Sequence, residues 1–383
     1  MMISILSNGF GETVIANKIA NKLVQLDTSL KVVIFPLIGN LRVDNRVIVG
    51  FNPRNLGSGG RTLHSVESFL KDVTSGALFE VVRFVRSFRS YRGIKLALVV
   101  GDPFLLILAK AFLRDAPRIV FNSVYKSELV EKHMWFEKML IKKCAEYFIP
   151  RDRYTYECFR KLGIRTVYFG NPMVDSVDFF GVDYRLDPNL KTLLLLPGSR
   201  ETTYRMLVKL LYVVESVFEK FGFFNVLCSL SSGISVEKLV STISQHGWRV
   251  EEKTSCSMIA TKGIIKVVLA YNSFGDMLVN SDVVLSCAGT ATEQSAGYGK
   301  PTIMFVDRDA GWSNRWYRRQ KILLGDNLKL FDKFGVTEIS DEIILLFNNS
   351  DERKRRGDIG KKMVEGVGSV EKIAGFLINL LYD

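Results

Sequence analysis

The chain has 383 residues, of which 47% are hydrophobic and 24% charged, so it can bury real cores and is not disordered. Because domains commonly contain about 100–200 residues, this length predicts two of them. The formal net charge of +12 favours anionic partners: nucleotides, phosphosugars, acidic lipids or nucleic acid.

Cysteine usage and apolar runs indicate the compartment. The five cysteines are scattered without a CxxC pair, which indicates a reducing compartment and no structural zinc. The N-terminus has no signal-peptide pattern. The longest apolar run, 96–109, is broken by Gly101-Asp102-Pro103 and is shorter than the ~20 residues of a membrane helix. We expect a cytoplasmic protein, soluble or peripheral on the inner face of the membrane.

The first half opens as a β-α-β unit. An apolar strand at 3–6, an amphipathic helix at 14–26 and a strand at 32–35 predict the start of a doubly wound parallel sheet. The loop SNGFGE lies at the ligand-binding end of the first strand, and without a third glycine it predicts a substrate loop rather than a nicotinamide site. Its candidate residues are Asn8, Gly9, Gly11 and the acid Glu12.

A second candidate acid follows a buried strand. The all-apolar strand at 96–100 ends in Gly101-Asp102-Pro103. An acid at the carboxyl end of a parallel strand lies at the usual active-site edge, so Asp102 is a candidate base. Asp102 is equally suited to cap a helix at 104–112, and the two roles are compatible.

Two helices of this half carry basic and aromatic side chains. The helix at 66–91 has an arginine stripe that can meet lipid headgroups or nucleic acid, or be a solvated face. The helix at 130–144 mixes lysines with Met134, Trp135 and Phe136, so it can lie in a membrane interface or pack into the core. The stripe comprises Arg83, Arg86, Arg89 and Arg92.

The second half repeats the pattern. Further strands at 118–121, 147–149 and 166–169 close the first half, and the polar segment 178–189 connects the two. Strands then follow at 192–196, 225–228, 264–269 and 282–286, and helices at 204–221, 236–246, 351–367 and 369–382, with a short helix or loop at 272–279. Two Rossmann-like domains facing across a cleft are predicted: 1–182 with the final helix 368–383, and 183–367.

The stretch 283–305 is the strongest candidate for an anion site. A short strand, a small-residue turn at 286–289 and a helix from Thr290, with Thr290 and Thr292 as candidate caps, point unpaired backbone N–H groups at an anion. Glu293, in the first turn, can accept hydrogen bonds from sugar hydroxyls. The alternative is an ordinary crossover packed by small residues.

Other residues near this stretch are candidates for the same ligand. Arg200 follows the strand 192–196 and can hold a diphosphate bidentately or pair with an acid such as Glu201. Phe274 and Met277 can contact a nucleobase or pack in the core. The triplet Asp307-Arg308-Asp309 is expected to be solvated, and no histidine spacing indicates a metal site.

Three segments carry a family resemblance. GNPMVD, LLPGSR and SCAGTATEQSAGYGKP, in this order, resemble the signature segments of the lipid-A-disaccharide synthase family, and more closely its related subgroup. SNGFGE and RRQKILLGDNLKL extend the resemblance over both domains. It implies a GT-B glycosyltransferase with the donor on the C-terminal domain, the acceptor on the N-terminal domain, no metal or other cofactor, and a last helix that crosses back to the first domain.

The resemblance also implies roles by position. It aligns Asp102 with the essential aspartate and Glu293 with the ribose ligand. The opening loop lacks the family's Ser-Gly-Glu-Thr-Ser-Gly-Asp form, and Phe10 replaces the histidine common in the subgroup, so the departures concern the acceptor side. The residues implied to bind the donor are Gly198, Ser199, Arg200, Gly289, Thr290, Ala291, Thr292 and Gln294.

The predicted activity is inverting transfer of an N-acetylglucosamine-type sugar from a UDP-sugar to a lipid-linked or phosphosugar acceptor. Arg200 and the helix start at Thr290 would stabilise the leaving diphosphate, and Asp102, or else Glu12, would take the acceptor's proton. Peripheral contact with an anionic membrane is expected, and no nucleic acid. The alternatives are a nucleotide-sugar 2-epimerase and a non-catalytic basic protein that binds a membrane or nucleic acid.

Overall fold

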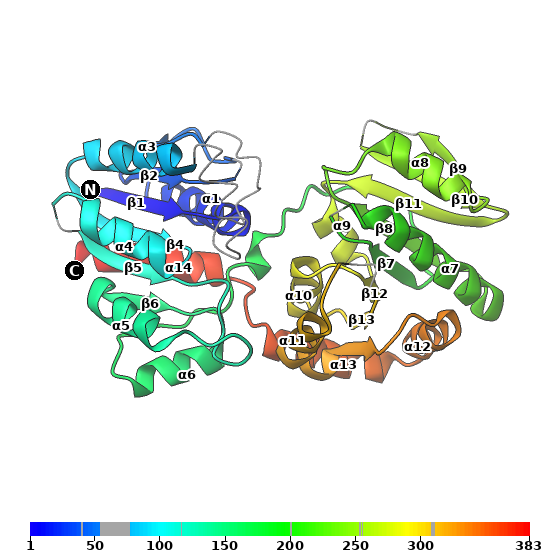
Figure 1. The fold of residues 1–383 in the computed structure, drawn as a ribbon. Coiled ribbons are helices and arrows are strands. Elements are labelled where there is room, and N and C mark those ends of the chain that lie inside the picture. The colour runs from blue at the N-terminus through cyan, green and yellow to red at the C-terminus, as the bar shows by residue number, and fades with distance from the viewer. Residues whose placement is uncertain are drawn as a thin grey trace. The chain divides into compact units, whose positions relative to one another are not determined.

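A computed structural model describes residues 1–39, 41–53, 77–115, 117–199, 201–252, 254, 256–307 and 311–383. They form two compact units (Figure 1). Unit 1 is Met1–Ser176 with Gly366–Asp383, and unit 2 is Val177–Glu365. The sequence placed these boundaries at 182 and 367. No helix of the described residues is long and apolar enough to cross a membrane.

Unit 1 contains a six-stranded sheet in the order β3-β2-β1-β4-β5-β6. Every neighbouring pair is parallel, as predicted. The chain reverses its winding between β1 and β4, and the carboxyl ends at such a point are where doubly wound folds bind ligands. The strands are β1 (Met2–Ser7), β2 (Lys31–Pro36), β3 (Ile48–Val49), β4 (Ile94–Val100), β5 (Arg118–Asn122) and β6 (Tyr147–Ile149).

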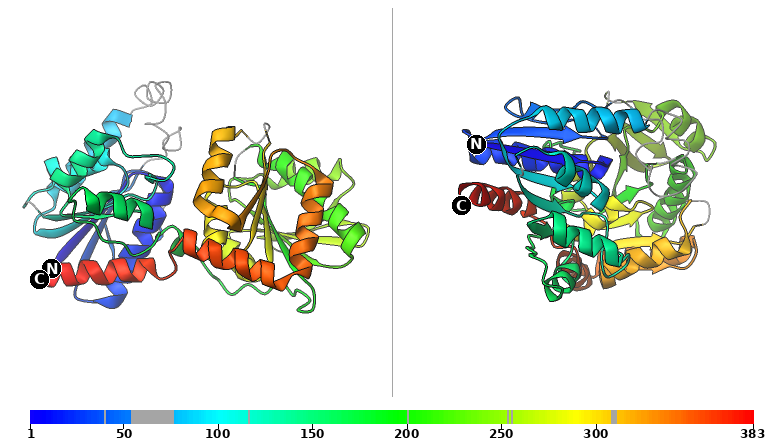
Figure 2. Two further views of the ribbon diagram at one scale, coloured as in Figure 1. Left: turned by 90° about the horizontal axis from the view of Figure 1, so that it is seen from below. Right: turned by 60° about the vertical axis from the view of Figure 1, so that its left-hand side comes forward.

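Helices cover both faces of this sheet. The helices α1 (Phe10–Leu26) and α14 (Ser369–Tyr382) bury their apolar sides in one core cluster, and the other helices bury theirs in a second. Asp175 holds the returning chain, since its carboxylate accepts from the amides of Gly368 (2.8 Å) and Val370 (2.9 Å). The last helix therefore belongs to unit 1, as predicted (Figure 2). The remaining helices are α3 (Ala77–Ser90), α4 (Pro103–Phe112), α5 (Trp135–Cys144), α6 (Arg153–Lys161) and the 3-10 turn η1 (Val174–Ser176).

Unit 2 contains an eight-stranded sheet in the order β14-β13-β12-β7-β8-β11-β10-β9. It is parallel except at β10, which is antiparallel to both neighbours. Here the winding reverses at β7, between β12 and β8. The strands are β7 (Thr192–Leu196), β8 (Asn225–Leu230), β9 (Arg249–Glu252), β10 (Ser257–Lys262), β11 (Ile265–Tyr271), β12 (Val283–Ser286), β13 (Thr302–Phe305) and β14 (Leu328–Phe331).

The helices of unit 2 also form two layers. The main core cluster joins one face of the sheet to α7, α8 and α12, and a smaller cluster on the other face contains α9 and part of α10. The helices are α7 (Thr203–Phe221), α8 (Val236–Ser244), α9 (Phe274–Val279), α10 (Thr290–Gly297), α11 (Asn314–Leu324), α12 (Val336–Asn348) and α13 (Ser350–Met363), with the 3-10 turn η3 (Gly325–Asn327).

Two glycines let α13 pack closely against the end of α10. A Cβ atom on Gly357 would lie 2.3 Å from the carbonyl oxygen of Gly299, and one on Gly360 would lie 2.5 Å from that of Ala296. Asn327 fixes the same junction, since its Nδ2 donates to the carbonyls of Lys300 (2.9 Å) and Arg356 (3.0 Å). This contact holds the C-terminal end of the helix that begins at the predicted anion turn.

The fold departs from the prediction in several segments. The predicted helix at 130–144 begins only at Trp135, and the predicted strand at 166–169 is reduced to one bridge at Thr166. The predicted helix at 351–367 ends at Met363. The hairpin strands β9 and β10, the strand β14 and the helices α11 and α12 were not predicted. Part of the predicted helix at 66–91 lies outside the described residues.

Gly357→Ala should destabilise the protein, because the new methyl group would collide with the carbonyl oxygen of Gly299. Overpacking of this kind costs about 1–3 kcal/mol. Gly375→Ala in α14 is the matched control, since its Cβ would meet nothing within 4 Å and it carries the same gain in helix propensity. Urea unfolding followed by circular dichroism measures both; equal midpoints would contradict the close packing.

Candidate functional site

The candidate donor site of unit 2 lies where β7 and β12 end. The two strands are parallel neighbours with Leu196 opposite Ser286, and the amide of Cys287 continues the pairing by donating to Leu196 O at 2.8 Å. Gly198 has φ +104°, a conformation that favours glycine, and a Cβ there would lie 3.7 Å from Cys287 O. The structure thus brings the loop after β7 and the turn before α10 together.

A pair of hydroxyls closes the turn before α10. Thr292 Oγ1 donates to Ala288 O at 2.6 Å and lies 2.6 Å from Ser286 Oγ, which in turn accepts from the Ala288 amide at 3.0 Å. Gly289 is the N-cap, and no side chain caps this helix. The prediction that Thr290 or Thr292 caps α10 is therefore wrong. The buried Thr292 hydroxyl donates its hydrogen bond within the turn.

Glu293 and Gln294 are buried in the first turns of α10. Glu293 Oε1 accepts from Gln320 Nε2 of α11 at 3.1 Å. The carboxylate predicted to hold ribose is thus already oriented by a neighbouring helix. Thr290 is exposed, and Gly289 and Ala291 are partly exposed.

Two tryptophans that the sequence did not single out border this turn. A Cβ atom on Gly289 would lie 3.1 Å from Cζ2 of Trp316, so the indole rests against the glycine. Trp316 stacks on Trp312, with ring centroids 4.0 Å apart and planes 9° apart. The signal in the sequence was the pair itself, GWSNRW, in the connection that follows β13; Ser313, between the two tryptophans, caps α11.

Phe274 and Met277 lie in α9 rather than in a loop. Met277 is fully buried in the smaller core cluster, where no ligand reaches it, and Phe274 packs partly exposed against the same cluster. Asp276 accepts hydrogen bonds from the amides of Phe180 (3.0 Å) and Gly181 (3.0 Å). These bonds hold the segment around residue 180, at the start of unit 2, against α9. Of the two predicted roles, Met277 therefore has core packing, whereas Phe274 remains a candidate for contact with a nucleobase.

The remaining predictions for unit 2 divide as follows. Asp307 is buried and paired with Lys209, so the prediction that it is solvated is wrong. Arg200, Arg308 and Asp309 lie outside the described residues, and Ser199 is exposed. Within the described part of the chain, no three His, Cys, Asp or Glu side chains gather to hold a metal ion.

Unit 1 has a similar edge where β1 and β4 end. Ser7 Oγ lies 2.8 Å from Thr13 Oγ1, and Thr13 Oγ1 donates to Ile38 O at 2.5 Å. The loop is crowded: a Cβ on Gly9 would lie 2.1 Å from Glu12 Oε2, and a Cβ on Gly101 would lie 2.1 Å from Asn8 Oδ1. The structure brings these predicted residues together, with Gly11 exposed in the first turn of α1.

Asp102 caps α4. Its Oδ1 accepts from the Leu105 amide at 3.0 Å, which confirms the capping role and leaves the catalytic role a prediction. The neighbouring strand ends in Asn122, a buried residue that the sequence did not single out. Its Nδ2 donates to Ile149 O at 2.9 Å, and none of the described residues hydrogen-bonds its Oδ1.

Comparison with solved structures identifies the architecture. The chain is 12% identical to a protein assigned as a UDP-N-acetylglucosamine 2-epimerase from Listeria monocytogenes, at a TM-score of 0.64 with 99% of this chain and 96% of that chain covered. The Neisseria meningitidis UDP-GlcNAc 2-epimerase bound to UDP-GlcNAc is 12% identical at a TM-score of 0.56, with 99% of this chain and 100% of that chain covered. A calicheamicin glycosyltransferase is 11% identical at a TM-score of 0.57, with 99% of this chain and 98% of that chain covered.

The chain has the GT-B fold. No family model and no curated protein sequence matches it. The GT-B fold is thus shown, whereas membership of the lipid-A-disaccharide synthase family is not. At such low identity the likeness carries the fold alone, so activity has to be argued from the residues.

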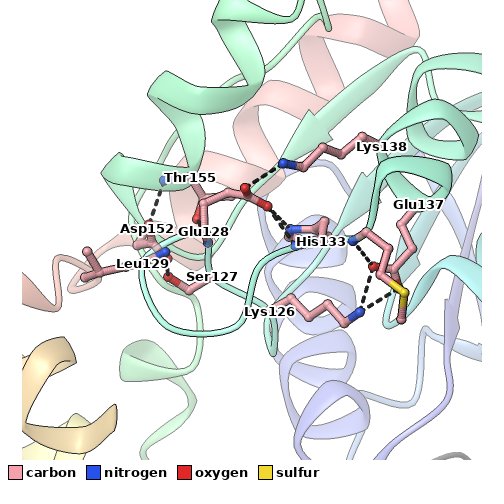
Figure 3. Close-up of polar contacts among 10 residues, drawn as sticks. Lys126, Ser127, Glu128, Leu129, His133, Glu137, Lys138, Asp152 and Thr155 are labelled. Atoms are coloured by element: carbon pink, nitrogen blue, oxygen red, sulfur yellow. Dashed lines mark hydrogen bonds and ion pairs between the residues drawn. The ribbon is translucent and has the colours of Figure 1, made fainter. Parts of the chain in front are cut away.

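In this GT-B chain, buried carboxylates fix the start of α5 (Figure 3). Glu128 Oε1 accepts from the backbone amide (2.8 Å) and Nδ1 (2.9 Å) of His133, and Oε2 accepts from Lys138 Nζ at 2.6 Å. Glu137 accepts from the Met134 amide at 2.8 Å and from Lys126. The backbone amides of His133 and Met134, just before Trp135, donate to these two carboxylates instead of to helical carbonyls. The predicted helix at 130–144 therefore starts late.

The α5 start presents apolar side chains to solvent. Trp135 is 74% exposed, Met134 56%, and Phe136 and Met139 about 40% each, with Lys132 and Lys143 also exposed. The neighbouring α4 adds its own exposed apolar residues, Phe104, Ile107 and Phe112. In α3, by contrast, Phe84 and Phe88 are buried between the arginines of the predicted stripe; Arg83 pairs with Glu80, and Arg86 and Arg89 are exposed.

Acid should destabilise unit 1 through His133. Burial lowers the pKa of His133 below its ordinary 6.5, because the core disfavours the charged ring. Burial alone would raise the pKa of Glu128, but hydrogen bonds from Lys138 and His133 lower it below 4.5. Because the unfolded chain binds protons first in both cases, stability falls as pH drops below 6.5 and further below 4.5.

His133→Asn, which keeps a donor near Glu128 without a titrating ring, tests this expectation. The variant should lose less thermal stability than the wild type between pH 7 and pH 5.5, measured as the unfolding temperature. The difference in unfolding temperature between wild type and variant at pH 8, where neither histidine nor asparagine carries charge, gives the cost of the substitution itself and is subtracted. Equal losses on acidification would exclude His133 as the cause.

Proposed function

We propose that this protein is a glycosyltransferase that uses a nucleotide-sugar donor. The observation that supports it is the meeting of two loops in unit 2, where the turn at Gly289 and the loop at Gly198 lie at the winding reversal of a GT-B sheet. Amides at the start of an uncapped helix attract a diphosphate. The donor is a UDP-sugar of the N-acetylglucosamine type, as in the neighbour bound to UDP-GlcNAc.

The proposed reaction is inverting transfer without a metal ion. The acceptor hydroxyl attacks C1 of the donor sugar, the bond from C1 to the diphosphate breaks, and the proton passes to Asp102, or else to Glu12. Arg200 and the amides at the start of α10 stabilise the charge that develops on the leaving diphosphate. Unit 1 carries the acceptor, a lipid-linked or phosphosugar molecule, because both candidate bases belong to it: Glu12 in the first turn of α1 and Asp102 at the start of α4.

A nucleotide-sugar 2-epimerase is the second candidate. The chain matches UDP-N-acetylglucosamine 2-epimerases over nearly their whole length, which favours this activity as much as transfer. The two enzymes differ in one requirement, since an epimerase turns over its substrate without an acceptor. Incubation with UDP-GlcNAc alone, followed by proton NMR of the sugar, separates them: formation of the 2-epimer would replace the transferase proposal.

Arg200→Ala should weaken nucleotide binding. Charge-assisted hydrogen bonds contribute about 1.5–3 kcal/mol, so the Kd for UDP should rise roughly 10–100-fold. Calorimetry with UDP measures it, and Arg249→Ala, an exposed arginine on β9 at the far edge of the same sheet, is the control. Wild-type affinity in the Arg200 variant would remove Arg200 from the site.

We also propose that the exposed apolar surface of α4 and α5 contacts anionic lipid, which would bring a lipid-linked acceptor to unit 1. Trp135 and Met139 supply apolar contact, and Lys132 and Lys143 supply the charge that such a surface attracts. Large exposed apolar patches rimmed by charge are typical of interaction surfaces.

Flotation with vesicles tests this contact. The wild type should bind phosphatidylglycerol vesicles and not phosphatidylcholine vesicles, and Trp135→Glu with Met139→Glu should abolish binding. Phe223→Glu is the matched control, because Phe223 is 62% exposed and belongs to unit 2. Binding that survives the double substitution, or that ignores lipid charge, would contradict the proposal.

A further inference from the structure

The stacked pair Trp312–Trp316 is the least expected feature of the donor edge. It contains two of the chain's four tryptophans, and both rings are partly exposed. The rings overlap almost in parallel, at 4.0 Å and 9°, and Tyr317 meets Trp316 edge-on at 5.1 Å. Trp312 also packs against the main core cluster of unit 2. The two stacked rings therefore form a flat aromatic surface, held by packing, after the carboxyl end of β13.

Three contacts fix this surface beside the anion turn. Trp316 rests against Gly289, and one turn further along both helices Gln320 donates to Glu293 at 3.1 Å, so α11 and α10 are held in register. The buried Tyr317 hydroxyl bonds the backbone of Asp307 at 3.4 Å, which ties α11 to the end of β13. A Cβ on Gly311 would lie 4.0 Å from Thr202, in the loop after β7.

We propose that the Trp312–Trp316 pair is the platform for the sugar ring of the donor. This inference rests on the proposed function. The sheet order β13-β12-β7-β8-β11 puts the diphosphate turn between Phe274, which follows β11, and the tryptophans, which follow β13. A nucleotide sugar carries its base and its sugar at opposite ends of the diphosphate. With the base toward Phe274, the sugar lies at the indoles, whose flat apolar faces suit the C–H face of a hexose.

A purely structural role for the pair makes a different prediction. If the indoles only anchored α11, their loss would lower stability and affect all ligands of the site alike. A platform for the sugar instead distinguishes UDP-GlcNAc from UDP, because only the former carries the ring that the indoles contact. The ratio of the two affinities is therefore the decisive quantity.

The test is calorimetry with UDP and with UDP-GlcNAc on the full chain. Trp316→Leu and Trp312→Leu should each weaken UDP-GlcNAc binding about 10-fold and UDP binding less than about 2-fold, since an aromatic contact of this size is lost only with the sugar. Trp316→Phe, which keeps a flat ring, should retain most of the affinity. Phe223→Leu, at an exposed aromatic residue of unit 2 with no proposed role, should change neither.

Parallel losses for UDP and UDP-GlcNAc, or no loss for either, would overturn the platform while leaving the proposed function standing. A wild type that binds neither probe would instead refute the proposed function. If the leucine variants do not fold, acrylamide quenching of the Trp135→Phe protein decides: UDP-GlcNAc should shield the remaining tryptophans more than UDP does. Equal shielding by the two nucleotides would again overturn the platform.

Discussion

A hydroxyl pair closes both strand-to-helix turns on which the functional proposals depend. In each unit the last residue of a strand is a serine, Ser7 or Ser286, and it bonds a threonine six residues later, at 2.8 and 2.6 Å. Each threonine hydroxyl also donates to a backbone carbonyl, Ile38 O or Ala288 O. A glycine, Gly9 or Gly289, is the N-cap, and neither helix has a side-chain cap hydrogen bond. The start of each helix thus lacks a side-chain cap, which is the condition under which its first amides can bind an anion.

Much of the fold could be predicted because the central strands are short apolar runs that end in glycine turns. The failures have local physical causes. The strand β9 is Arg-Val-Glu-Glu, whose charges conceal it, and α11 is basic around a narrow buried stripe that includes Tyr317 and Leu324. At α5 the carboxylate of Glu128 bonds the backbone and ring of His133, so hydrogen bonds within the preceding loop override a helical pattern.

The candidate site was predicted less completely than the fold, because its details come from packing between distant segments. The glycine turns could be located, since strand ends and glycines are visible in the sequence. The partner of Glu293 could not, because Gln320 reaches it only through the docking of α11 on α10. Met277 is likewise buried by residues of strands distant in the sequence, such as Leu194 and Val284. Trp316 reaches Gly289 through the same docking of α11 on α10.

The GT-B fold alone does not choose between transfer and epimerisation, since both activities occur among its neighbours. Unit 1 offers the stronger argument. An enzyme that only interconverts a soluble nucleotide sugar gains nothing from a tryptophan 74% exposed on a helix whose start is fixed by two buried carboxylates. An enzyme whose acceptor is attached to a lipid does gain from it, because the exposed residues of α4 and α5 are apolar with lysines beside them. The proposed lipid contact of that surface is therefore the point on which the choice between the two proposed activities depends.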